Sequence, residues 1–419
     1  MSGSILDVAV VGSGFAGISA SYYLKHFDLD HIVFEKGRIG QAWRGAHDSL
    51  TLNVPNGLSV LPGTPYTPEF PEAFSSASDF LAGMEHYATR FQLPISEHSN
   101  VLRIEKPDDS PYYELTVYHE NDGERKYYSW RILMATGEFG LRPAPLGNFV
   151  GPDVSQVHSC DYRRPSMLRE GAILVVGSGQ SGCEIAEELL MEGRAVYLAT
   201  SKSARLPRRY RGKDVFEWLL DINAFDPGGL LCDAMETDPV VSGFGEGGHV
   251  ISLQNLQRDG AVLLGRMEGI NGYLAHFDNS LPGNARFADD YEQSLLQAVD
   301  DFIVKKRIIA PVHEEPESVE SPKPAAVPKF DTAPSTLDLM ERNVRSIIWA
   351  TGTEPDFRSL GIPSAIGADG RPIHAAGISP VEGLFYLGYR NLRGPKSNFL
   401  FGIRDDASYI CNAIYTSIR

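Results

Sequence analysis

The sequence predicts an α/β protein made of two similar domains, because one pattern of apolar run, glycine turn and helix occurs twice. Each run is rich in β-branched residues, as expected of a buried parallel strand, and the turns begin at Gly12 and Gly177. Each turn has the spacing G-x-G-x-x-G, which is typical of a Rossmann-like dinucleotide-binding fold. We therefore expect two such domains, each with three layers in the order β-β-α.

A repeated tripeptide predicts how the two domains are connected. Ala-Thr-Gly ends one apolar run at residues 135–137 and another at 350–352, on either side of the second glycine turn. This echo indicates that the second domain is inserted into the first and that the C-terminus completes the first. The expected divisions are 1–150 for the first part of the first domain, 151–345 for the second domain with its insertions, and 346–419 for the remainder of the first.

The first turn predicts a site for a dinucleotide without a 2′-phosphate. Gly12 permits a tight turn, Gly14 admits a pyrophosphate and Gly17 lets the helix approach the strand, so phosphate would lie at the N-terminus of the following helix. The next strand ends at Glu35, 23 positions after Gly12. An acid there binds ribose hydroxyls and repels a 2′-phosphate, which favours FAD or NAD over NADP. The alternative is a solvent-exposed glutamate at a strand end.

The second turn, with Gly177, Gly179 and Gly182, predicts a site for NADPH. The strand that follows it ends without an acid and runs into five basic residues: Lys202, Arg205, Arg208, Arg209 and Arg211. Charge-assisted hydrogen bonds to a phosphate contribute about 1.5–3 kcal/mol each, so two would favour NADPH over NADH by about a hundredfold or more. The alternative is a solvated basic loop.

Periodicity and turn residues place the remaining elements. Helices are predicted over 18–26, from Ser78 with its own hydroxyl as the cap, and over 183–192, 289–306 and about 404–416. Strands are predicted over 31–34, 112–118, 126–134, 172–176, 195–199, 249–253, 261–264, 344–350 and 384–387. Residues 40–71 are predicted as an ordered loop region without a helix, 142–152 as a connector between domains and 313–337 as a mobile surface loop, while the rest of 221–286 stays unassigned.

Composition excludes several classes of function. The net charge of −16 disfavours nucleic-acid binding, which needs a basic face. No apolar run is long enough to cross a membrane, and the N-terminus has no signal-peptide pattern, so we expect a cytoplasmic protein. The four cysteines are far apart and neither they nor the histidines form a metal signature, so we expect no metal. The sequence leaves open whether the chain forms a homodimer.

Eight motifs together resemble one superfamily across nearly the whole chain. They are G-S-G-F-A-G from Gly12, G-Q-A-W-R from Gly40, L-N-V-P from Leu52, H-S-C-D-Y from His158, G-S-G-Q-S-G from Gly177, L-P-R-R-Y-R-G from Leu206, A-T-G-T-E-P-D-F from Ala350 and G-I-R-D-D-A from Gly402. On these the chain resembles the flavin-containing (class B) monooxygenases and their bacterial CzcO-like relatives, FAD/NAD(P)-binding oxidoreductases.

The resemblance implies FAD and NADPH as cofactors, and molecular oxygen and a small organic molecule as substrates. In such enzymes NADPH reduces FAD, the reduced flavin captures oxygen as a C4a-hydroperoxide, and a substrate nitrogen or sulfur takes the distal oxygen. The alternatives are a flavin-dependent NADPH oxidase or reductase, a Baeyer–Villiger monooxygenase, and a non-enzymatic redox-sensing flavoprotein. Tyr162, where similar Baeyer–Villiger enzymes usually have Trp, favours heteroatom oxygenation.

The resemblance also assigns roles to individual residues. Asn53 would hydrogen-bond the peroxyflavin or the nicotinamide, or else is a turn residue before a proline. His158 matches the histidine of a family fingerprint that links the domains, although Pro152 and Val154 stand where that fingerprint has Phe and Gly. The G-I-R-D-D-A stretch would open the last helix, whose N-terminal N–H groups would face the flavin N1/C2 carbonyl region; alternatively, Asp405 or Asp406 simply caps that helix. The residues expected to contact a cofactor are Gly12, Gly14, Phe15, Ala16, Gly17, Glu35, Lys36, Gln41, Trp43, Arg44, Asn53, Thr136, Gly177, Gly179, Gln180, Ser181, Gly182, Lys202, Arg208, Arg209, Ala350, Thr351, Gly352 and Arg404.

Overall fold

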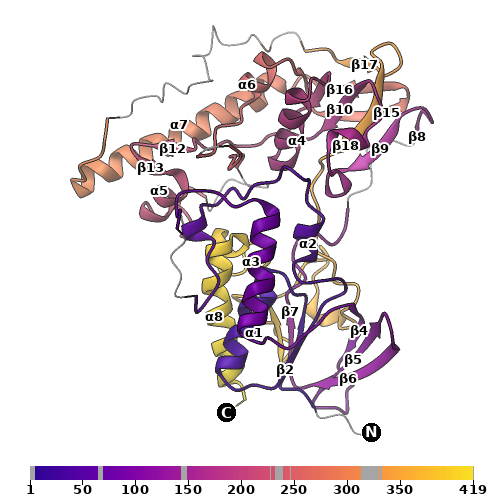
Figure 1. Cartoon of the computed structure of the whole chain (residues 1–419), viewed down its shortest axis with the longest axis vertical. Helices are drawn as coiled ribbons and strands as arrows, with labels where there is room; N and C mark the ends of the chain where they lie inside the picture. Colours follow the sequence, from indigo (N-terminus) through magenta and orange to yellow (C-terminus); the bar gives the residue numbers. More distant parts are fainter. Residues whose placement is uncertain are drawn as a thin grey trace.

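Two lobes stacked end to end make up the molecule, and both chain termini lie at the far end of one lobe (Figure 1). The computed structural model describes residues 5–64, 69–142, 149–226, 228–231, 239–245, 247–312, 330 and 333–418. The first lobe combines the N-terminal and C-terminal parts of the chain, and the second is formed by the middle (Figure 1).

A parallel sheet of five strands organises the first lobe. Its order is β19 (Leu384–Tyr386), β7 (Ile132–Met134), β1 (Val8–Val11), β2 (His31–Phe34) and β3 (Ile95–Ser96). Helices α1 (Phe15–His26), α3 (Ala77–Arg90) and α8 (Leu400–Thr416) pack on one face, and an antiparallel sheet of β4 (Ser99–Glu105), β5 (Tyr113–His119) and β6 (Gly123–Ser129) packs on the other. Strand β1 is buried from both sides: Val8 and Val10 contact the helices, while Ala9 and Val11 contact the antiparallel sheet.

The second lobe repeats these three layers. Its main sheet has the order β14 (Val262–Leu264), β11 (Val196–Ala199), β10 (Ala172–Val176), β18 (Val344–Trp349) and β9 (Ser155–His158), again all parallel. Helices α4 (Gln180–Met191), α6 (Leu253–Arg258) and the start of α7 (Leu281–Lys306) bury one face. A sheet of β17 (Thr336–Asp338), β16 (Leu274–Phe277), β15 (Met267–Gly272) and β8 (Phe149–Val150) buries the other.

A third apolar cluster joins the lobes. The hairpin β12 (Arg209–Tyr210) and β13 (Lys213–Asp214) leads into α5 (Val215–Asp221), which packs against the second half of α7. Val54 and Phe401 of the first lobe are buried in the same cluster. The remaining short elements are α2 (Gln41–Arg44) and the 3-10 turns η1 (Asn56–Leu58), η2 (Ser159–Asp161), η3 (Pro165–Met167), η5 (Pro363–Ala365) and η6 (Pro395–Asn398).

The predicted fold class is confirmed: two three-layer Rossmann-like domains, with β19 and α8 returning to the first. Both predicted domain boundaries, however, miss by a few residues. β8 ends at Val150 yet pairs with β15, and β18 crosses the boundary at 345/346 yet pairs only with strands of the second lobe. The Ala-Thr-Gly echo therefore marks corresponding strands of the two lobes, and not two strands of one sheet.

Several element predictions are corrected by tertiary contacts. Residues 126–134 form two strands, β6 and β7, in different sheets, because the chain turns after Ser129. Residues 249–253 are not a strand: His249 forms only an isolated bridge with Ser242, and α6 begins at Leu253. A helical turn, α2, lies within the loop predicted over 40–71. Ser76 caps α3 in place of Ser78, because its Oγ accepts from Asp79 N–H.

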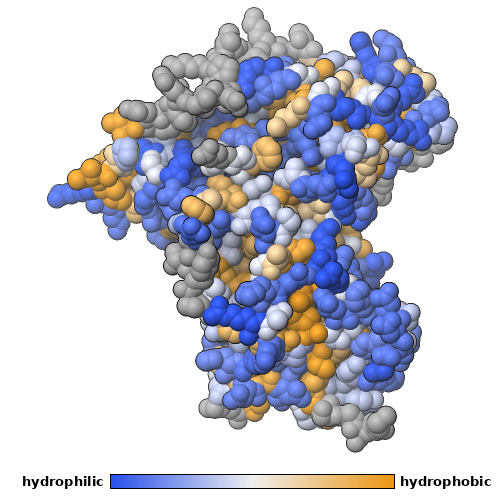
Figure 2. Space-filling view, in the orientation of Figure 1, coloured by the Kyte–Doolittle hydropathy of each residue, from blue (hydrophilic) through white to orange (hydrophobic). Residues whose placement is uncertain are grey.

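The two longest helices begin earlier than predicted. α7 starts at Leu281 and α8 at Leu400, so Asp405 and Asp406 lie inside α8 and do not cap it. α7 extends from the second lobe as an arm whose end carries apolar and hydrophilic residues side by side (Figure 2). Val304, near the end of α7, and Ile309 and Val312, in the segment that follows it, are exposed. No helix in the described ranges is long and apolar enough to cross a bilayer. Cys232 and most of the predicted connector and surface loop lie outside the described residues.

Candidate active site

The first glycine turn has the geometry that its spacing predicts. Gly12 has φ of +101°, and a Cβ atom there would lie 2.6 Å from the Ala135 carbonyl oxygen. A Cβ on Gly17 would lie 1.9 Å from the Gly12 oxygen, so only glycine lets α1 approach the turn. Gly14, between them, has no atom within 4 Å of such a Cβ. The turn is therefore closed on the protein side and open where a pyrophosphate would lie.

The second glycine turn reproduces this arrangement position by position. Gly177 has φ of +109°, and a Cβ atom there would lie 2.3 Å from the Ala350 oxygen; a Cβ on Gly182 would lie 1.9 Å from the Gly177 oxygen, whereas one on Gly179 would meet no atom within 4 Å. The backbone oxygens of Ala135 and Ala350 thus pack against the first glycine of the turn in their respective lobes, which explains the repeated Ala-Thr-Gly. The first residues of α1 and α4, including Phe15, Ala16, Gln180 and Ser181, follow the open glycines directly.

The residue after the second strand differs between the lobes. Glu35 is buried, and its Oε2 accepts from Ser13 N–H at 2.9 Å while its Oε1 accepts from Gly37 N–H at 2.9 Å. Thr200 stands 23 positions after Gly177, the same interval, and its hydroxyl donates to the Leu264 oxygen. The second lobe thus has a neutral side chain at the position of the acid, and exposed Lys202 follows two residues later.

The predicted phosphate-binding arginines are engaged by carboxylates of the protein. Arg208 is buried and binds Asp214 through two contacts of 2.5 and 2.6 Å, so its guanidinium already has a carboxylate partner in this structure. Arg209 pairs with Glu72 at 2.9 Å on the surface. Arg205 and Arg211 bind carboxylates of α7, Glu292 and Asp300 respectively. Lys202 contacts the Phe287 ring. Of the five basic residues after the second strand, it is the one whose described contacts include no carboxylate.

Asn53 is brought to the start of α4. With its amide nitrogen facing Glu184 Oε1 at 3.2 Å and the Val241 oxygen at 3.1 Å, its amide oxygen accepts from Gln180 Nε2 at 3.0 Å. All three partners belong to the second lobe, whereas Asn53 belongs to the first. Because Gln180 is the residue after the open Gly179, Asn53 lies beside the second dinucleotide turn.

His158 has neither ring nitrogen free. Cys160 N–H donates to Nδ1 at 3.2 Å, so Nε2 carries the proton and donates to the Gly352 oxygen at 3.2 Å. Burial lowers the pKa of His158, which keeps the ring neutral at pH 7. The geometry holds the chain after β9 against the Ala-Thr-Gly of β18 and leaves no nitrogen for proton transfer.

The other predicted contacts divide between the two lobes. Thr136 hydrogen-bonds the Tyr389 hydroxyl at 2.8 Å, whereas the hydroxyl of its counterpart Thr351 is buried with no partner in the described part of the chain. Trp43 packs against the Phe80 ring, and Arg44 pairs with Glu85 of α3. Lys36 is exposed, Gln41 accepts from Arg38 N–H, and Arg404 lies in the second turn of α8.

A polar network between the lobes was not predicted. Ser49 donates to Glu188 Oε1 at 2.8 Å and buried Tyr162 donates to Glu188 Oε2 at 2.6 Å. His47 hydrogen-bonds Ser49, and its Nε2 lies 3.8 Å from Glu184 Oε2. The acids of α4 at helical spacing were visible in the sequence, but nothing in it paired Glu188 with Tyr162, 26 positions away, or with Ser49, 139 positions away.

The residues present fit two dinucleotides. Gly14 and Gly179 leave a cradle that a larger side chain would fill, and the helix N-termini behind them favour an anion. The orphaned Thr351 hydroxyl points to a missing polar partner beside the second turn.

Comparison with known proteins agrees with this geometry. The family described as pyridine nucleotide-disulphide oxidoreductase matches residues 9–219. The chain belongs to this family. It is 30% identical over 423 residues to a CzcO-like oxidoreductase from Geobacillus kaustophilus, with 98% of each chain covered.

Two solved structures share this fold. A flavin-containing monooxygenase from Stenotrophomonas maltophilia superposes with a TM-score of 0.66 at 18% identity, and all of both chains is covered. A bacillithiol disulfide reductase from Bacillus cereus superposes with a TM-score of 0.60 at 15% identity, with 99% of each covered.

These findings confirm the family suspected from the motifs, and they confirm the predicted cofactors, FAD and NADPH, as those of this class. As a member of the pyridine nucleotide-disulphide oxidoreductase family, the chain is a flavin-dependent oxidoreductase.

Proposed function

We propose that this oxidoreductase is an NADPH- and oxygen-dependent monooxygenase acting on a nitrogen or sulfur atom of a small organic molecule. The observation that carries the proposal is that Asn53, from the lobe with the first open turn, meets Gln180, the residue that follows the open Gly179 of the second turn. The turn at Gly14 would hold FAD and the turn at Gly179 would hold NADPH, so that their reactive rings meet near Asn53.

Each lobe supplies contacts suited to its own nucleotide. Glu35 would accept from the adenosine ribose hydroxyls of FAD and exclude a 2′-phosphate, whereas Thr200 and Lys202 leave room and positive charge for the 2′-phosphate of NADPH. When bound, FAD takes hydride from NADPH and supplies the oxygen chemistry. The protein then has to position the rings and keep bulk water away.

Asn53 is the residue that we assign to the reaction centre. Its amide is held by Gln180 and Glu184 and would hydrogen-bond the nicotinamide or the flavin ring, as the class B resemblance implies. His158 acts structurally, because both of its nitrogens are engaged. Thr351 would donate to the dinucleotide at the second turn.

The second candidate is a flavin-dependent NADPH oxidase or reductase. The fold similarity to the bacillithiol disulfide reductase favours it, since that enzyme shares the two-lobed architecture. Cys160, Cys183 and Cys411, the cysteines in the described ranges, are free, and burial raises the pKa of each thiol. A buried thiol of raised pKa is a poor nucleophile, so dithiol chemistry is the weaker reading.

A stoichiometry experiment separates these candidates. Purified FAD-loaded enzyme is given NADPH, oxygen and a panel of amines, sulfides and ketones, and NADPH consumed, oxygenated product and hydrogen peroxide are measured. The proposal expects product from an amine or a sulfide with little peroxide. Product from ketones alone indicates a Baeyer–Villiger enzyme, and peroxide with no product for any compound rejects a monooxygenase on this panel. No NADPH consumption at all would indicate the non-enzymatic reading.

We infer that the partners are oxygen and a small molecule. The cytoplasmic location stays a prediction that cell fractionation would test. Whether the chain forms a homodimer is a separate question that light scattering would decide.

A further inference from the structure

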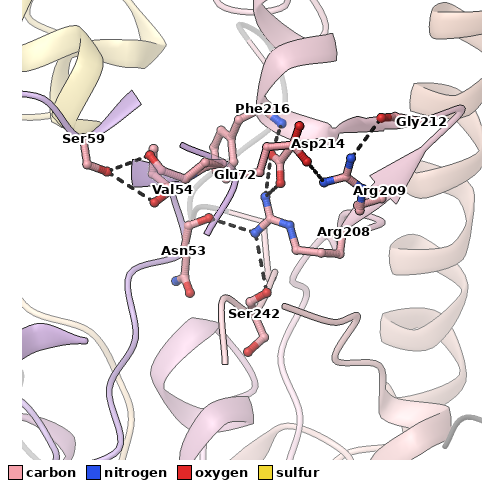
Figure 3. A network of polar contacts seen from close by, with 11 residues as sticks. Asn53, Val54, Ser59, Glu72, Arg208, Arg209, Gly212, Asp214, Phe216 and Ser242 are labelled. Atoms are coloured by element: carbon pink, nitrogen blue, oxygen red, sulfur yellow. Dashed lines mark hydrogen bonds and ion pairs between the residues drawn. The ribbon is translucent and has the colours of Figure 1, made fainter. Parts of the chain in front are cut away.

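Arg208 makes contacts that its sequence context did not predict. Its guanidinium binds Asp214 on one edge, and on the other its Nη1 donates to the backbone oxygen of Asn53 at 2.9 Å (Figure 3). The side chains of Arg208 and Asp214 are only 4% and 3% exposed. A charged pair so far from water, with a hydrogen bond across the two lobes, is a specific arrangement and not a solvated basic loop.

Aromatic rings from both lobes enclose this guanidinium. Its carbon lies 4.6 Å from the centroid of Phe74, in the first lobe, and 5.6 Å from that of Phe216, in α5. Asp214 is itself held, because its Oδ1 accepts from Phe216 N–H at 2.9 Å and caps α5. The pair is therefore fixed to α5 at one end and to Asn53 at the other (Figure 3).

Asn53 is held from two sides by the second lobe. Gln180 and Glu184 hold the side-chain amide, and Arg208 holds the carbonyl that follows it. Fixing that carbonyl fixes the peptide plane and hence the direction of the Asn53 side chain. A Cβ on Gly243 would lie 2.0 Å from the Leu52 oxygen, so the second lobe also closes tightly on the residue before Asn53.

We propose that Arg208, anchored by Asp214, is a positioning residue that sets Asn53 in the reaction centre, and that it does not bind the 2′-phosphate of NADPH. The inference rests on the proposed function, since it places Asn53 against the bound nicotinamide. The inference gives the basic residues two separate roles: Arg208 orients Asn53, and Lys202 would bind the 2′-phosphate of NADPH.

The test compares Asn53→Ala, which removes the amide itself, with three further variants of FAD-loaded enzyme. Arg208→Lys keeps the charge beside Asp214, but an ammonium lacks the planar fork that reaches Asp214 and the Asn53 oxygen together. The double variant Arg208→Met/Asp214→Asn removes both buried charges and retains a residue able to cap α5. It therefore controls for the misfolding that a single unpaired buried charge would cause. Arg194→Lys is the matched control, because Arg194 also donates to backbone oxygens but only within its own lobe.

Calorimetry without turnover gives the first readout. We expect Arg208→Lys and Asn53→Ala each to weaken the binding of NADP⁺ and of NAD⁺ by about the same factor, on the order of tenfold. When the two substitutions are combined, we expect their losses of affinity to be non-additive. The ratio of NADP⁺ to NAD⁺ affinity stays within about twofold of the wild type. A selective loss of NADP⁺ affinity would mean that Arg208 binds the phosphate, and additive losses would mean that it acts independently of Asn53; either overturns the inference.

Turnover gives the second readout. The two Arg208 variants are expected to release about tenfold more hydrogen peroxide per NADPH than the wild type, as Asn53→Ala does, while Arg194→Lys does not. Unchanged peroxide release in both Arg208 variants, with Asn53→Ala affected, also contradicts the inference. If the wild type oxygenates no substrate, the proposed function fails, whereas the calorimetric cycle still decides the role of Arg208.

Discussion

The proposed nucleotide sites depend on single glycines, because a Cβ on the open glycine of each turn meets no atom within 4 Å, whereas one on either of the others meets backbone. We predict that Gly14→Val loses the yellow flavin while Gly179→Val retains it and loses reduction by NADPH. The fold survives both changes, since a Cβ at either position meets no protein atom within 4 Å and Gly14 has φ of −72°, which any residue adopts. Absorbance of the purified protein and anaerobic bleaching by NADPH measure the two effects.

Two further glycines serve as controls for that prediction. Gly83→Ala, in α3, also adds a Cβ in open space but away from both turns, so flavin content and reduction should not change. Gly17→Val should instead fail to fold, because its Cβ would lie 1.9 Å from the Gly12 oxygen. Flavin and reduction retained in both open-glycine variants would contradict the assignment of the two sites.

His249 gives the stability a pH dependence that can be isolated. Burial alone would lower its pKa, but the hydrogen bond and charge of Glu187, 2.8 Å away, outweigh burial and raise it above the usual value of about 6.5. A base whose folded pKa is raised stabilises the fold fully below its unfolded pKa and loses this contribution as pH rises through the folded pKa. The melting temperature of the wild type should therefore exceed that of His249→Gln most near pH 6 and converge with it in alkali. A gap that widens with pH would refute this.

At the scale of elements, α3 shows how a cap is chosen. Both Ser76 and Ser78 precede the apolar stripe, but Ser76 Oγ accepts from Asp79 N–H at 3.1 Å while Ser78 already has helical conformation. Ser76→Ala should lower the stability of α3 by about 1 kcal/mol, and Ser78→Ala should have a much smaller effect. Hydrogen exchange of a peptide spanning 76–84 compares them, and equal protection in both variants would speak against Ser76 as the cap.

Elements whose residues interact locally were predicted well, and those defined by distant partners were not. β2 and β10 match their predicted residues, and for β10 the reason is that an apolar run before a glycine turn has one stable role in this fold. Residues 126–134 form one run in sequence but two strands in space, since each half pairs with a different sheet. In the site, the glycine spacing predicted both turns. No sequence pattern indicated that Arg208 would pair with Asp214 and donate to the backbone oxygen of Asn53.

For the whole molecule, function depends on how the two lobes are held relative to each other. Hydride transfer needs the reacting atoms within about 3.5 Å, and in the sites proposed above each lobe would hold one nucleotide. The contacts between the lobes include the apolar cluster around Val54 and Phe401, the clamp by Arg208, the side chain of Asn53 and the network centred on Glu188. The network centred on Glu188 lies along α4, the helix that begins at the second glycine turn.

Ser49 tests whether that network sets the distance between the nucleotides. Ser49→Ala removes the hydrogen bond from the first lobe to Glu188 while Tyr162 still donates to it, so no buried carboxylate is left without a partner. We expect anaerobic reduction of the flavin by saturating NADPH to slow by about tenfold, because small misplacements of reacting groups are costly. Flavin content stays unchanged. Ser294→Ala, which loses only a bond within α7, should reduce at the wild-type rate. Equal rates in all three proteins would show that the hydrogen bond from Ser49 to Glu188 does not set the distance between the nucleotides.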